Sequence, residues 1–459
     1  RNGVMEFLLI NHPLDCPICD QAGECGLQEF SVEHGRGTSR FEEMKVKKPK
    51  NVEIGPRIRL DDERCIMCSR CIRFMDEVAD DPVLGFIDRG THTTLTVHPG
   101  RRLDNNYSLN TADICPVGAL TSNDFRFQMR VWFLKETKSI DVNCGTGCNT
   151  VIWTRGNEIF RITPRENNDV NSSWMPDSHR LNFHYLHAET RLGDPFIRRG
   201  FKHEVSDWRA AISETVEGLQ GFKGEEIAVI GSGRMTNEEL YLLRRLADTL
   251  ETDLISLVPR LGKSDGKLIS ADRNPNTSGA KLIWASQNPY AKLDAIRQGV
   301  ETGRIKALIV FYEDLLGDAQ FEADDLAKLE FLVSNNILTN GTAKASHVVL
   351  PGAGFAEKRG SLVNVTGRLQ RLNQAIPPPP GAMDDWEIIR DLIKALAPDE
   401  PSRYLLEEVF SEIADDVDEF EELTLSKIGD LGIPILDTGE SIPLLEAERA
   451  RITAGEIVG

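Results

Sequence analysis

Seven of the nine cysteines of this 459-residue chain lie in its first 115 residues, where they form two groups. The first group has the spacing His-x3-Cys-x2-Cys-x5-Cys and consists of His12, Cys16, Cys19 and Cys25. The second group has the spacing Cys-x2-Cys-x2-Cys, followed at a distance by Cys-Pro, and consists of Cys65, Cys68, Cys71 and Cys115. Thiolates spaced in this way hold iron–sulfur cubes in ferredoxins. We therefore predict that these eight residues are metal ligands.

The first group, taken alone, leaves two metals open. One histidine and three cysteines are a common ligand set for structural zinc as well as for a four-iron cluster. The second group favours iron, because bacterial ferredoxins use its cysteine run regularly and zinc seldom does. Spacing does not assign Cys115, since in two-cluster ferredoxins the distant cysteine serves the other cluster. The number of ligands favours assigning Cys115 to the second group, because the first group already has four.

The elements that position the ligands are expected to be short helices joined by loops. Apolar residues at helical spacing predict a short amphipathic helix in residues 1–11, which Pro13 cannot continue. His12 then lies where the helix gives way to the ligand loop. Gly23 and Gly26 provide backbone freedom beside the last cysteine of the first group. The basic run KVKKPK, residues 45–50, is expected to be an exposed loop.

Three strings carry a family resemblance: GVMEFLLINHPLDCPICDQAGECGLQ, RCIMCSRCIRF and ICPVGALTS. They resemble the large iron–sulfur subunit, known as the G subunit, of NADH-quinone oxidoreductase (respiratory complex I). The resemblance implies a four-iron cluster on the His/Cys3 group and an all-cysteine four-iron cluster that includes Cys115. Members of that family usually begin with a two-iron ferredoxin domain, whose cysteines would precede Arg1. We therefore expect a truncated chain, with a 2Fe-2S cluster only in the missing domain.

The resemblance also implies a function. The chain is expected to be an electron-transfer subunit, with two 4Fe-4S clusters relaying electrons from a flavin/NADH-binding subunit toward cluster-bearing and quinone-site subunits. No catalytic residue is expected on the chain itself, because the clusters supply the chemistry. The implied location is the peripheral arm of a membrane complex, on the cytoplasmic side. A protein scaffold stapled by zinc is an alternative of another class.

Residues from about 139 resemble the four-iron domain that opens molybdenum and tungsten bis-pterin oxidoreductases. Here Asp141 stands where the first cysteine of that domain belongs and Pro176 stands near the place of the last, which leaves Cys144 and Cys148. Four ligands are the rule for a cube. We predict a vestigial site and no molybdenum cofactor. A molybdenum formate dehydrogenase is the alternative, but it would need an intact third site and a later cysteine, and no cysteine follows Cys148.

From about residue 205 the pattern changes to alternating strands and helices, which predicts a doubly wound α/β domain. Apolar runs at residues 227–230, 253–258, 281–286, 307–312 and 331–338 are expected to be parallel strands. Thr236 is expected to cap the helix that follows the first strand. Gly231 and Gly233 lack the third glycine of a dinucleotide fingerprint, so a plain tight turn is the preferred interpretation.

Composition limits the class of protein. The formal net charge of −19 argues against nucleic acid as a partner. No stretch approaches the roughly 20 apolar residues of a membrane span, so membrane association is expected only through partners. The predicted fold class is multidomain α/β, a ferredoxin-like iron–sulfur region followed by a molybdopterin-oxidoreductase-like domain. The predicted domains are the His/Cys3 segment (1–35), the ferredoxin-like domain (36–135), the vestigial four-iron domain (136–195), the α/β domain (196–400) and an acidic helical tail (401–459).

Overall fold

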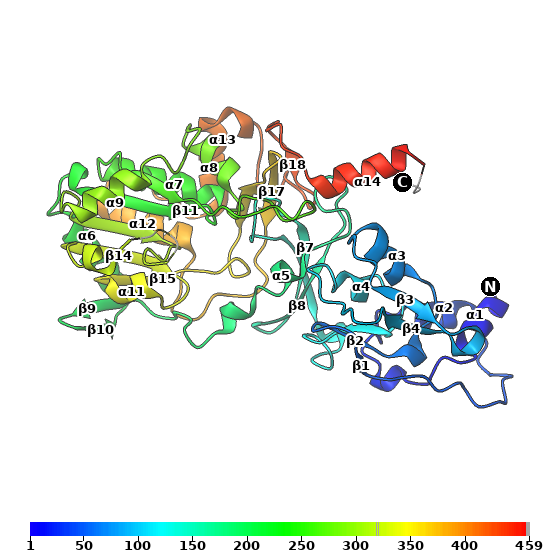
Figure 1. Ribbon diagram of the computed structural model, residues 1–459. Coiled ribbons are helices and arrows are strands. Elements are labelled where there is room, and N and C mark those ends of the chain that lie inside the picture. Colours follow the sequence, from blue (N-terminus) through cyan, green and yellow to red (C-terminus); the bar gives the residue numbers. More distant parts are fainter. Residues whose placement is uncertain (318, 320, 456–459) are drawn as a thin grey trace. The chain divides into compact units, whose positions relative to one another are not determined.

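The computed structural model describes residues 1–317, 319 and 321–455 (Figure 1). The chain divides into two compact units. The N-terminal unit comprises Arg1–Glu136, Trp153–Pro164 and Trp174–Asn182, and the C-terminal unit comprises Thr137–Ile152, Arg165–Ser173 and Phe183–Gly459. The five domain boundaries expected from the sequence stay a prediction. None of the helices in the described residues has both the length and the apolar character that crossing a bilayer requires.

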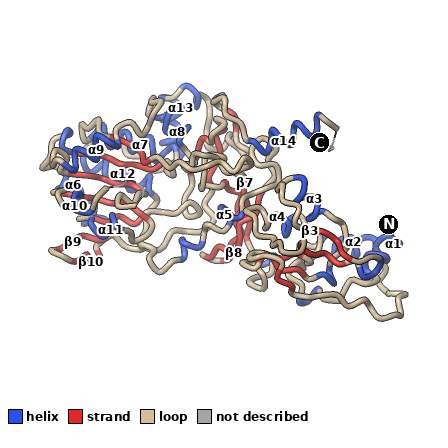
Figure 2. The backbone as a smooth tube through the Cα atoms, viewed as in Figure 1, coloured by secondary structure: helices blue, strands red, loops and turns tan. Residues whose placement is uncertain are grey.

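The N-terminal unit consists mainly of loops with short helices and strands, as the tube drawing shows (Figure 2). Two small antiparallel sheets have the orders β1-β2-β5 and β3-β4. The strands are β1 (Val52–Glu53), β2 (Ile58–Leu60), β3 (Leu84–Ile87), β4 (Thr94–Val97) and β5 (Leu120–Ser122). The helices are α1 (Asn2–Leu9), α2 (Gly26–His34), α3 (Arg70–Glu77), α4 (Asn110–Asp113) and α5 (Asp177–Arg180). The expected first helix is thus confirmed as α1.

The C-terminal unit is built on a seven-stranded sheet of order β10-β9-β15-β14-β13-β11-β12. The five strands from β15 to β12 are parallel to their neighbours, and β9 and β10 extend the sheet antiparallel. The strands are β9 (Phe196–Arg199), β10 (Lys202–Val205), β11 (Ile227–Ser232), β12 (Ile255–Val258), β13 (Ala307–Phe311), β14 (Phe331–Asn336) and β15 (Val348–Pro351). This confirms the doubly wound α/β layer.

Helices cover both faces of this sheet, because alternate residues of its buried strands point to opposite faces. Val229 and Ile309 pack in one core with helices α6, α7, α12 and α13, whereas Ile230 and Val310 pack in a second core with α9 and α10. These helices are α6 (Trp208–Leu219), α7 (Asn237–Thr249), α9 (Leu293–Glu301), α10 (Ala323–Leu326), α12 (Asp385–Leu396) and α13 (Leu406–Asp416). Purely apolar strands are expected where both faces are covered.

The remaining elements complete the described chain. Strands β16, β17 and β18 form one antiparallel sheet, and β6, β7 and β8 form another three-stranded sheet. Their bounds are β6 (Lys135–Ile140), β7 (Asn149–Arg155), β8 (Glu158–Pro164), β16 (Gly360–Val363), β17 (Arg368–Leu372) and β18 (Ile433–Pro434). The other helices are α8 (Thr277–Ile283), α11 (Gly341–Ala345) and α14 (Pro443–Thr453).

Two local predictions in the C-terminal unit are confirmed and one is wrong. Thr236 caps α7, since its hydroxyl accepts from the Glu239 N–H at 3.3 Å. A Cβ on Gly233 would lie 2.5 Å from Asn274, so protein fills this space and the tight-turn interpretation holds. The apolar run at residues 281–286 is not a strand, because it lies at and beyond the end of α8, where Trp284 Nε1 donates to the Leu240 carbonyl at 3.0 Å. An apolar run of this length is compatible with either a strand or a segment of a buried helix.

Candidate iron–sulfur site

The ligands of the first group lie at the ends of short helical elements. Cys16 begins the 3-10 helix η1 (Cys16–Ile18), and Cys25 is the N-cap residue of α2. Gly23 has φ +95°, and a Cβ there would lie 2.6 Å from the ring of Trp132. Only glycine suits this backbone conformation and this close approach. The sequence expectation of special backbone geometry is therefore confirmed at Gly23. At Gly26 it is wrong, because Gly26 begins α2 without a left-handed φ, and a Cβ there would meet nothing within 4 Å.

The second group lies in a tightly curled loop. Met67 and Ser69 both have left-handed φ angles, +56° and +59°, on either side of Cys68. The loop leads into α3, which contains Cys71. Left-handed residues other than glycine are uncommon and mark a chain that is held in a special path. Here the two left-handed residues flank the middle cysteine of the run.

Electrostatic interactions show which thiols the fold brings together. Burial raises the pKa of Cys71 to about 12, and Cys115, Cys65 and Cys68 raise it further. In the first group, burial raises the pKa of Cys19, and Cys25 and Cys16 add to the increase. Each cysteine group thus gathers in space. The interaction of Cys115 with the other three supports its assignment to the second group.

His12 has the properties of an unprotonated ligand. Burial lowers its pKa to about 4, and the charges of Arg64 and Lys45 lower it further. Its Nδ1 is buried and has no hydrogen-bond partner among the described residues. Buried polar atoms without a partner are rare, and each calls for an explanation. A metal-bound imidazole nitrogen provides one.

Neither ligand group forms a tight set of three donor atoms. All nine cysteines are free. Within the described residues, no three ligand atoms of either group lie within 4.8 Å of one another. A tetrahedral zinc ion with Zn–S bonds of about 2.3 Å would bring its four ligand atoms within roughly 4 Å of one another. Donors that surround a four-iron cube stand farther apart than this.

The two ligand groups share a wall formed by the segment after Cys115. The Cys25 thiol lies 3.7 Å from the Pro116 carbonyl oxygen. A Cβ on Gly118 would lie only 2.3 Å from the Cys19 sulfur. Cys25, Cys65 and Cys115 also pack against one small hydrophobic core that contains Met5, Leu27, Val117 and Ala119. The segment that closes the second group therefore touches the first group directly.

A buried arginine joins the segments that precede the two groups. Arg64 stands immediately before Cys65, and its side chain is only 4% exposed. It donates to the Asp15 carboxylate at 3.0 Å and 3.2 Å and to the Gly118 carbonyl at 3.4 Å. Asp15 in turn precedes Cys16. Sequence reasoning missed Arg64, Asp15 and Gly118, although all three stand within three residues of a predicted ligand.

The basic run at residues 45–50 is a loop, as expected, but only three of its six residues are exposed. The Lys45 ammonium donates to the carbonyl oxygens of Leu9 and Ile10 at 3.0 Å and 2.7 Å. Lys48, 12% exposed, lies 3.6 Å from the buried Asp62 carboxylate. These contacts tie the run to the end of α1 and to the loop before Cys65. A charge run in a sequence does not show which buried acids lie near it.

The two cysteines of the expected vestigial site, Cys144 and Cys148, are both fully buried. Burial raises the pKa of Cys144 to about 11 and that of Cys148 well above its ordinary value, and Asp141 adds to both shifts. Burial raises the pKa of Cys65 and Cys71 in the same way, so this shift does not distinguish the vestigial site from the second ligand group. The difference between the sites is the number of cysteines, two here against four in the second group.

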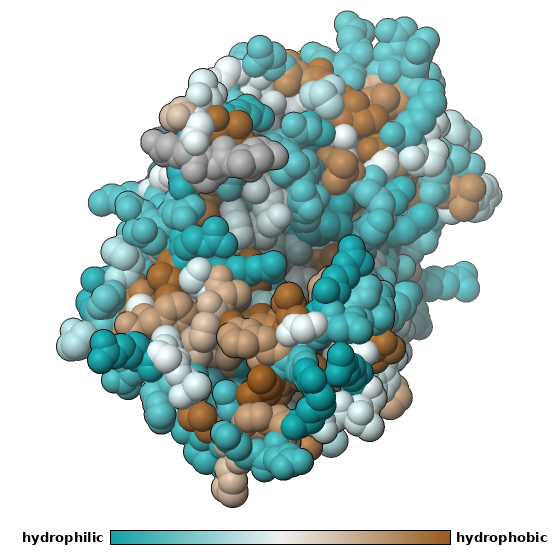
Figure 3. All heavy atoms as spheres, turned by 90° about the vertical axis from the view of Figure 1, so that its right-hand side faces the viewer, coloured by the Kyte–Doolittle hydropathy of each residue, from teal (hydrophilic) through white to brown (hydrophobic). Residues whose placement is uncertain are grey.

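The exposed hydrophobic side chains of the first 44 residues form a distinct surface feature. Figure 3 views the molecule from the side of the N-terminal helices and shows hydrophobic atoms at the surface there. The exposed residues are Val4, Phe7, Leu14, Ile18, Phe30, Val32 and Met44. Large exposed apolar surface usually marks an interaction site.

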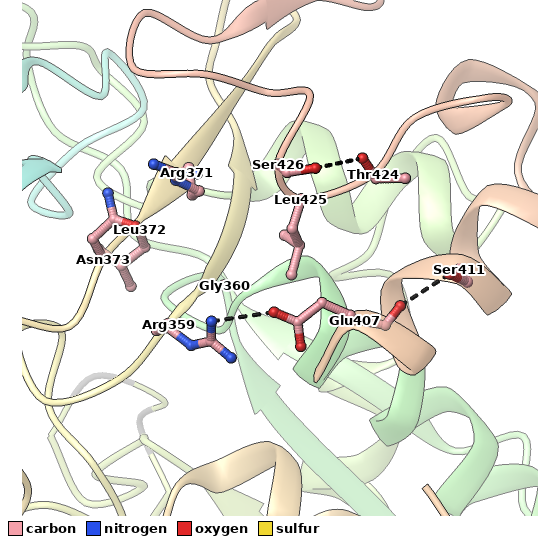
Figure 4. A pocket seen from close by; sticks show the side chains of 10 residues that line it. All are labelled: Arg359, Gly360, Arg371, Leu372, Asn373, Glu407, Ser411, Thr424, Leu425 and Ser426. Carbon is pink, nitrogen blue, oxygen red and sulfur yellow. Dashed lines mark hydrogen bonds and ion pairs between the residues drawn. The ribbon is translucent and has the colours of Figure 1, made fainter. Parts of the chain in front are cut away.

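A cavity of about 430 Å³ in the C-terminal unit has a different character (Figure 4). Arg359 and Glu407 form an ion pair of 3.1 Å in its wall, and Arg371 lies 3.6 Å from Asp430. Among the described residues, no cysteine or histidine side chain lines this cavity. The candidate redox site is therefore in the N-terminal unit.

Family models match four segments of the chain. Residues 1–40 match the NADH-ubiquinone oxidoreductase-G iron-sulfur binding region. Residues 55–121 match the ferredoxin-like domain of NADH-quinone oxidoreductase subunit 3. Residues 134–184 match the NDSU1/NuoG-like 4Fe-4S domain of NADH-ubiquinone oxidoreductase, and residues 267–395 match molybdopterin oxidoreductase. The eight predicted ligands all lie within the first two matched segments.

Relatives of known name agree with these matches. The NADH-quinone oxidoreductase G subunit of Rickettsia felis is 42% identical over 56% of this chain and 38% of its own length. The mitochondrial NADH-ubiquinone oxidoreductase 78 kDa subunit of Neurospora crassa is 30% identical over 85% of this chain and 69% of its own length. The match thus spans well under half of the Rickettsia protein. Among solved structures, acetylene hydratase of Pelobacter acetylenicus has a TM-score of 0.44 and 10% identity, and the match covers 63% of this chain and 73% of the hydratase.

Proposed function

This chain belongs to the family of the NADH-quinone oxidoreductase G subunit, and from that premise we propose that it holds two four-iron clusters and relays electrons between partner subunits. His12, Cys16, Cys19 and Cys25 would hold the first cluster. Cys65, Cys68, Cys71 and Cys115 would hold the second. When bound, the clusters accept and release single electrons, and the chain's own residues hold and position them.

The observation that carries this proposal is the wall shared by the two ligand groups. Pro116 and Gly118, which follow the last cysteine of the second group within three residues, contact Cys25 and Cys19 of the first group. Contact of this kind supports exchange of electrons between clusters held by the two groups. No acid, base or nucleophile is needed for that role.

His12 would give the two clusters different reduction potentials. Its low pKa keeps the imidazole neutral at pH 7, so the first ligand set carries one negative charge fewer than four thiolates. The buried guanidinium of Arg64 adds positive charge on the same side, since it acts on both His12 and Cys19. Less negative surroundings raise a cluster's reduction potential.

Partners follow from the family. The relay would receive electrons from a flavin-bearing, NADH-binding subunit and deliver them to further cluster-bearing and quinone-site subunits. The exposed hydrophobic side chains of residues 1–44 are suited to burial against such a partner. The chain would reach the membrane only through the peripheral arm of that assembly, on the cytoplasmic side.

The C-terminal unit would serve as a structural platform without molybdenum. Its α/β fold matches the molybdopterin oxidoreductase model, but the chain has no cysteine after Cys148 to ligate such a metal. Only two cysteines, Cys144 and Cys148, remain in the third segment, and Asp141 stands where another cysteine belongs, which supports a lost third cluster site. A formate dehydrogenase would need an intact third cluster site and a metal-binding cysteine after Cys148, so this function is not favoured.

Metal analysis together with spectroscopy tests the proposal. Protein purified without oxygen should contain about eight irons and about eight sulfides per chain. Low-temperature paramagnetic resonance of the reduced protein should show two distinct four-iron signals. About twelve irons would contradict the vestigial third site, whereas zinc in place of iron would refute the electron-transfer function.

A further inference from the structure

A buried polar cluster in the C-terminal unit, remote in sequence from the cysteines, has no part in electron transfer. It lies where helices α7 and α12 begin, beside the carboxyl ends of β13 and β14. Its acidic members are Glu239 of α7, Asp384, which is the N-cap residue of α12, and Asp385. Carboxylate oxygens of these three residues all lie within 4.8 Å of one another. Ligands of parallel α/β sheets bind at this end of the strands.

The cluster contains the basic side chain of Lys358, whose single positive charge does not balance the negative charges of the three carboxylates. The Lys358 ammonium lies 2.7 Å and 2.9 Å from the two oxygens of Glu239 and 3.5 Å from Asp385. It also contacts the hydroxyl of Tyr312, which in turn contacts Asp385. Lys358 is 2% exposed and Asp385 is fully buried. Three carboxylates thus face one ammonium, and buried charge normally has a partner.

Several buried polar atoms at this place have no hydrogen-bond partner among the described residues. They are Oδ1 of Asp384, Oδ1 of Asp385, and both the oxygen and the nitrogen of the Asn335 amide. Asp384 occupies an N-cap position, yet its side chain makes no capping hydrogen bond. Such a concentration of unsatisfied atoms is unusual in a protein interior.

Two of these side chains lie beside Gly352. A Cβ at Gly352 would lie 2.1 Å from Asp385 Oδ1 and 2.8 Å from Asn335 Nδ2. The amide oxygen and nitrogen are nearly indistinguishable in shape, so the Asn335 amide can present either atom there. Asn335 is 1% exposed, and its amide lies next to Asp385 Oδ1 without bonding to it. Only glycine at position 352 lets the backbone approach these two side chains so closely.

We propose that Glu239, Asp384, Asp385 and Asn335 bind a hard divalent cation. Carboxylate and amide oxygens are the ligands that Ca²⁺ and Mg²⁺ prefer in proteins. The ion would neutralise the two carboxylates that Lys358 leaves unbalanced and would satisfy the unpartnered oxygens. Without the ion, burial and the neighbouring carboxylates raise the pKa of Asp384 well above its ordinary value. Burial also raises the pKa of Glu239 to about 7. The site would fasten α12 to the sheet.

The test uses the full chain with its clusters, stripped of loosely bound ions by a chelator. Calorimetric titration with CaCl₂ and with MgCl₂ should show saturable binding of a single ion per chain and a higher melting temperature. NaCl at matched ionic strength should neither bind saturably nor raise the melting temperature. Comparison of CaCl₂ with MgCl₂ shows which ion is preferred. No saturable binding of either ion would overturn the proposal.

Two variants distinguish an ion site from a structural network. Asn335→Leu removes only a side chain that bonds to nothing in the described residues, and Asp384→Asn removes one charge. Both should fold, as judged by circular dichroism and unchanged iron content, and both should lose the ion-dependent rise in melting temperature. Asp253→Asn, at a carboxylate that is 94% exposed, is the matched control and should bind like the parent protein. If Asn335→Leu binds the ion as the parent does, the amide is no ligand and the proposal fails.

Discussion

The Cys25 sulfur lies 3.7 Å from the carbonyl oxygen of Pro116, a residue 91 positions later in the chain. Cys25 belongs to the first ligand group, and Pro116 follows the last cysteine of the second. This contact shows that the two groups are adjacent parts of one structure.

Gly118→Ala should destroy the first site while the protein remains folded. The added Cβ would stand 2.3 Å from the Cys19 sulfur, a distance that real contacts do not reach, so the Cys19 loop must move. Iron content should fall from about eight to about four per chain, with loss of one paramagnetic signal. Gly26→Ala is the matched control, because its Cβ would meet nothing within 4 Å although it adjoins Cys25. Full iron content in Gly118→Ala would contradict the shared wall.

His12→Cys should lower the reduction potential of the first cluster. The change replaces a neutral imidazole with a thiolate, and the additional negative charge disfavours reduction. We expect a decrease on the order of 100 mV, measured by redox titration followed by paramagnetic resonance. The second cluster in the same sample is the internal reference and should not shift. Equal potentials for the variant and the parent would show that His12 is not a ligand.

Arg64→Gln should destabilise the N-terminal unit. The guanidinium is buried and bonds Asp15 and the Gly118 carbonyl, so its loss leaves buried acceptors unsatisfied. Breaking a buried pair costs about 3 kcal/mol, seen as a lower melting temperature. Arg40→Gln is the control, since the Arg40 side chain is 68% exposed and its pair with Glu6 contributes little. An equal decrease in melting temperature for Arg64→Gln and Arg40→Gln would refute a special role for Arg64.

The stability of the C-terminal unit should depend on pH through His347. Burial lowers the pKa of His347 to about 4, from an ordinary value of 6.5, and the Arg198 charge lowers it further. Its Nδ1 accepts the Leu332 N–H at 3.0 Å, which requires an unprotonated nitrogen. Between these pH values the unfolded chain binds a proton that the folded chain does not. The free energy of unfolding therefore falls as pH falls through this window.

His347→Gln removes this titration. Chemical unfolding measured from pH 7.5 to pH 4, monitored on the C-terminal unit, should give a shallower decrease for the variant than for the parent protein. Other groups titrate in the same range, so the difference between the two curves is the relevant quantity. Parallel curves would show that His347 titrates alike in the folded and unfolded chains.

Much of the fold could be predicted from local pattern. Strands β11, β12, β13 and β14 are rich in apolar residues, and Thr236 is a good capping residue, so short-range chemistry was sufficient. The expected strand at residues 281–286 is absent because an apolar segment of that length suits a helix end as well as a strand. The partial burial of the basic run at residues 45–50 was missed because the buried carboxylate beside Lys48 lies elsewhere in the sequence.

The spacing of His12 and the seven cysteines in the first 115 residues is a local property of the chain, so the predicted ligand sets can be derived without knowledge of the fold. Only the tertiary structure placed Gly118 against Cys19, Arg64 between the two groups, and Asn335 beside Asp385. These contacts join residues that are 49 to 99 positions apart in the chain. Close packing and buried charge depend on the path of the whole chain, which local periodicity does not record.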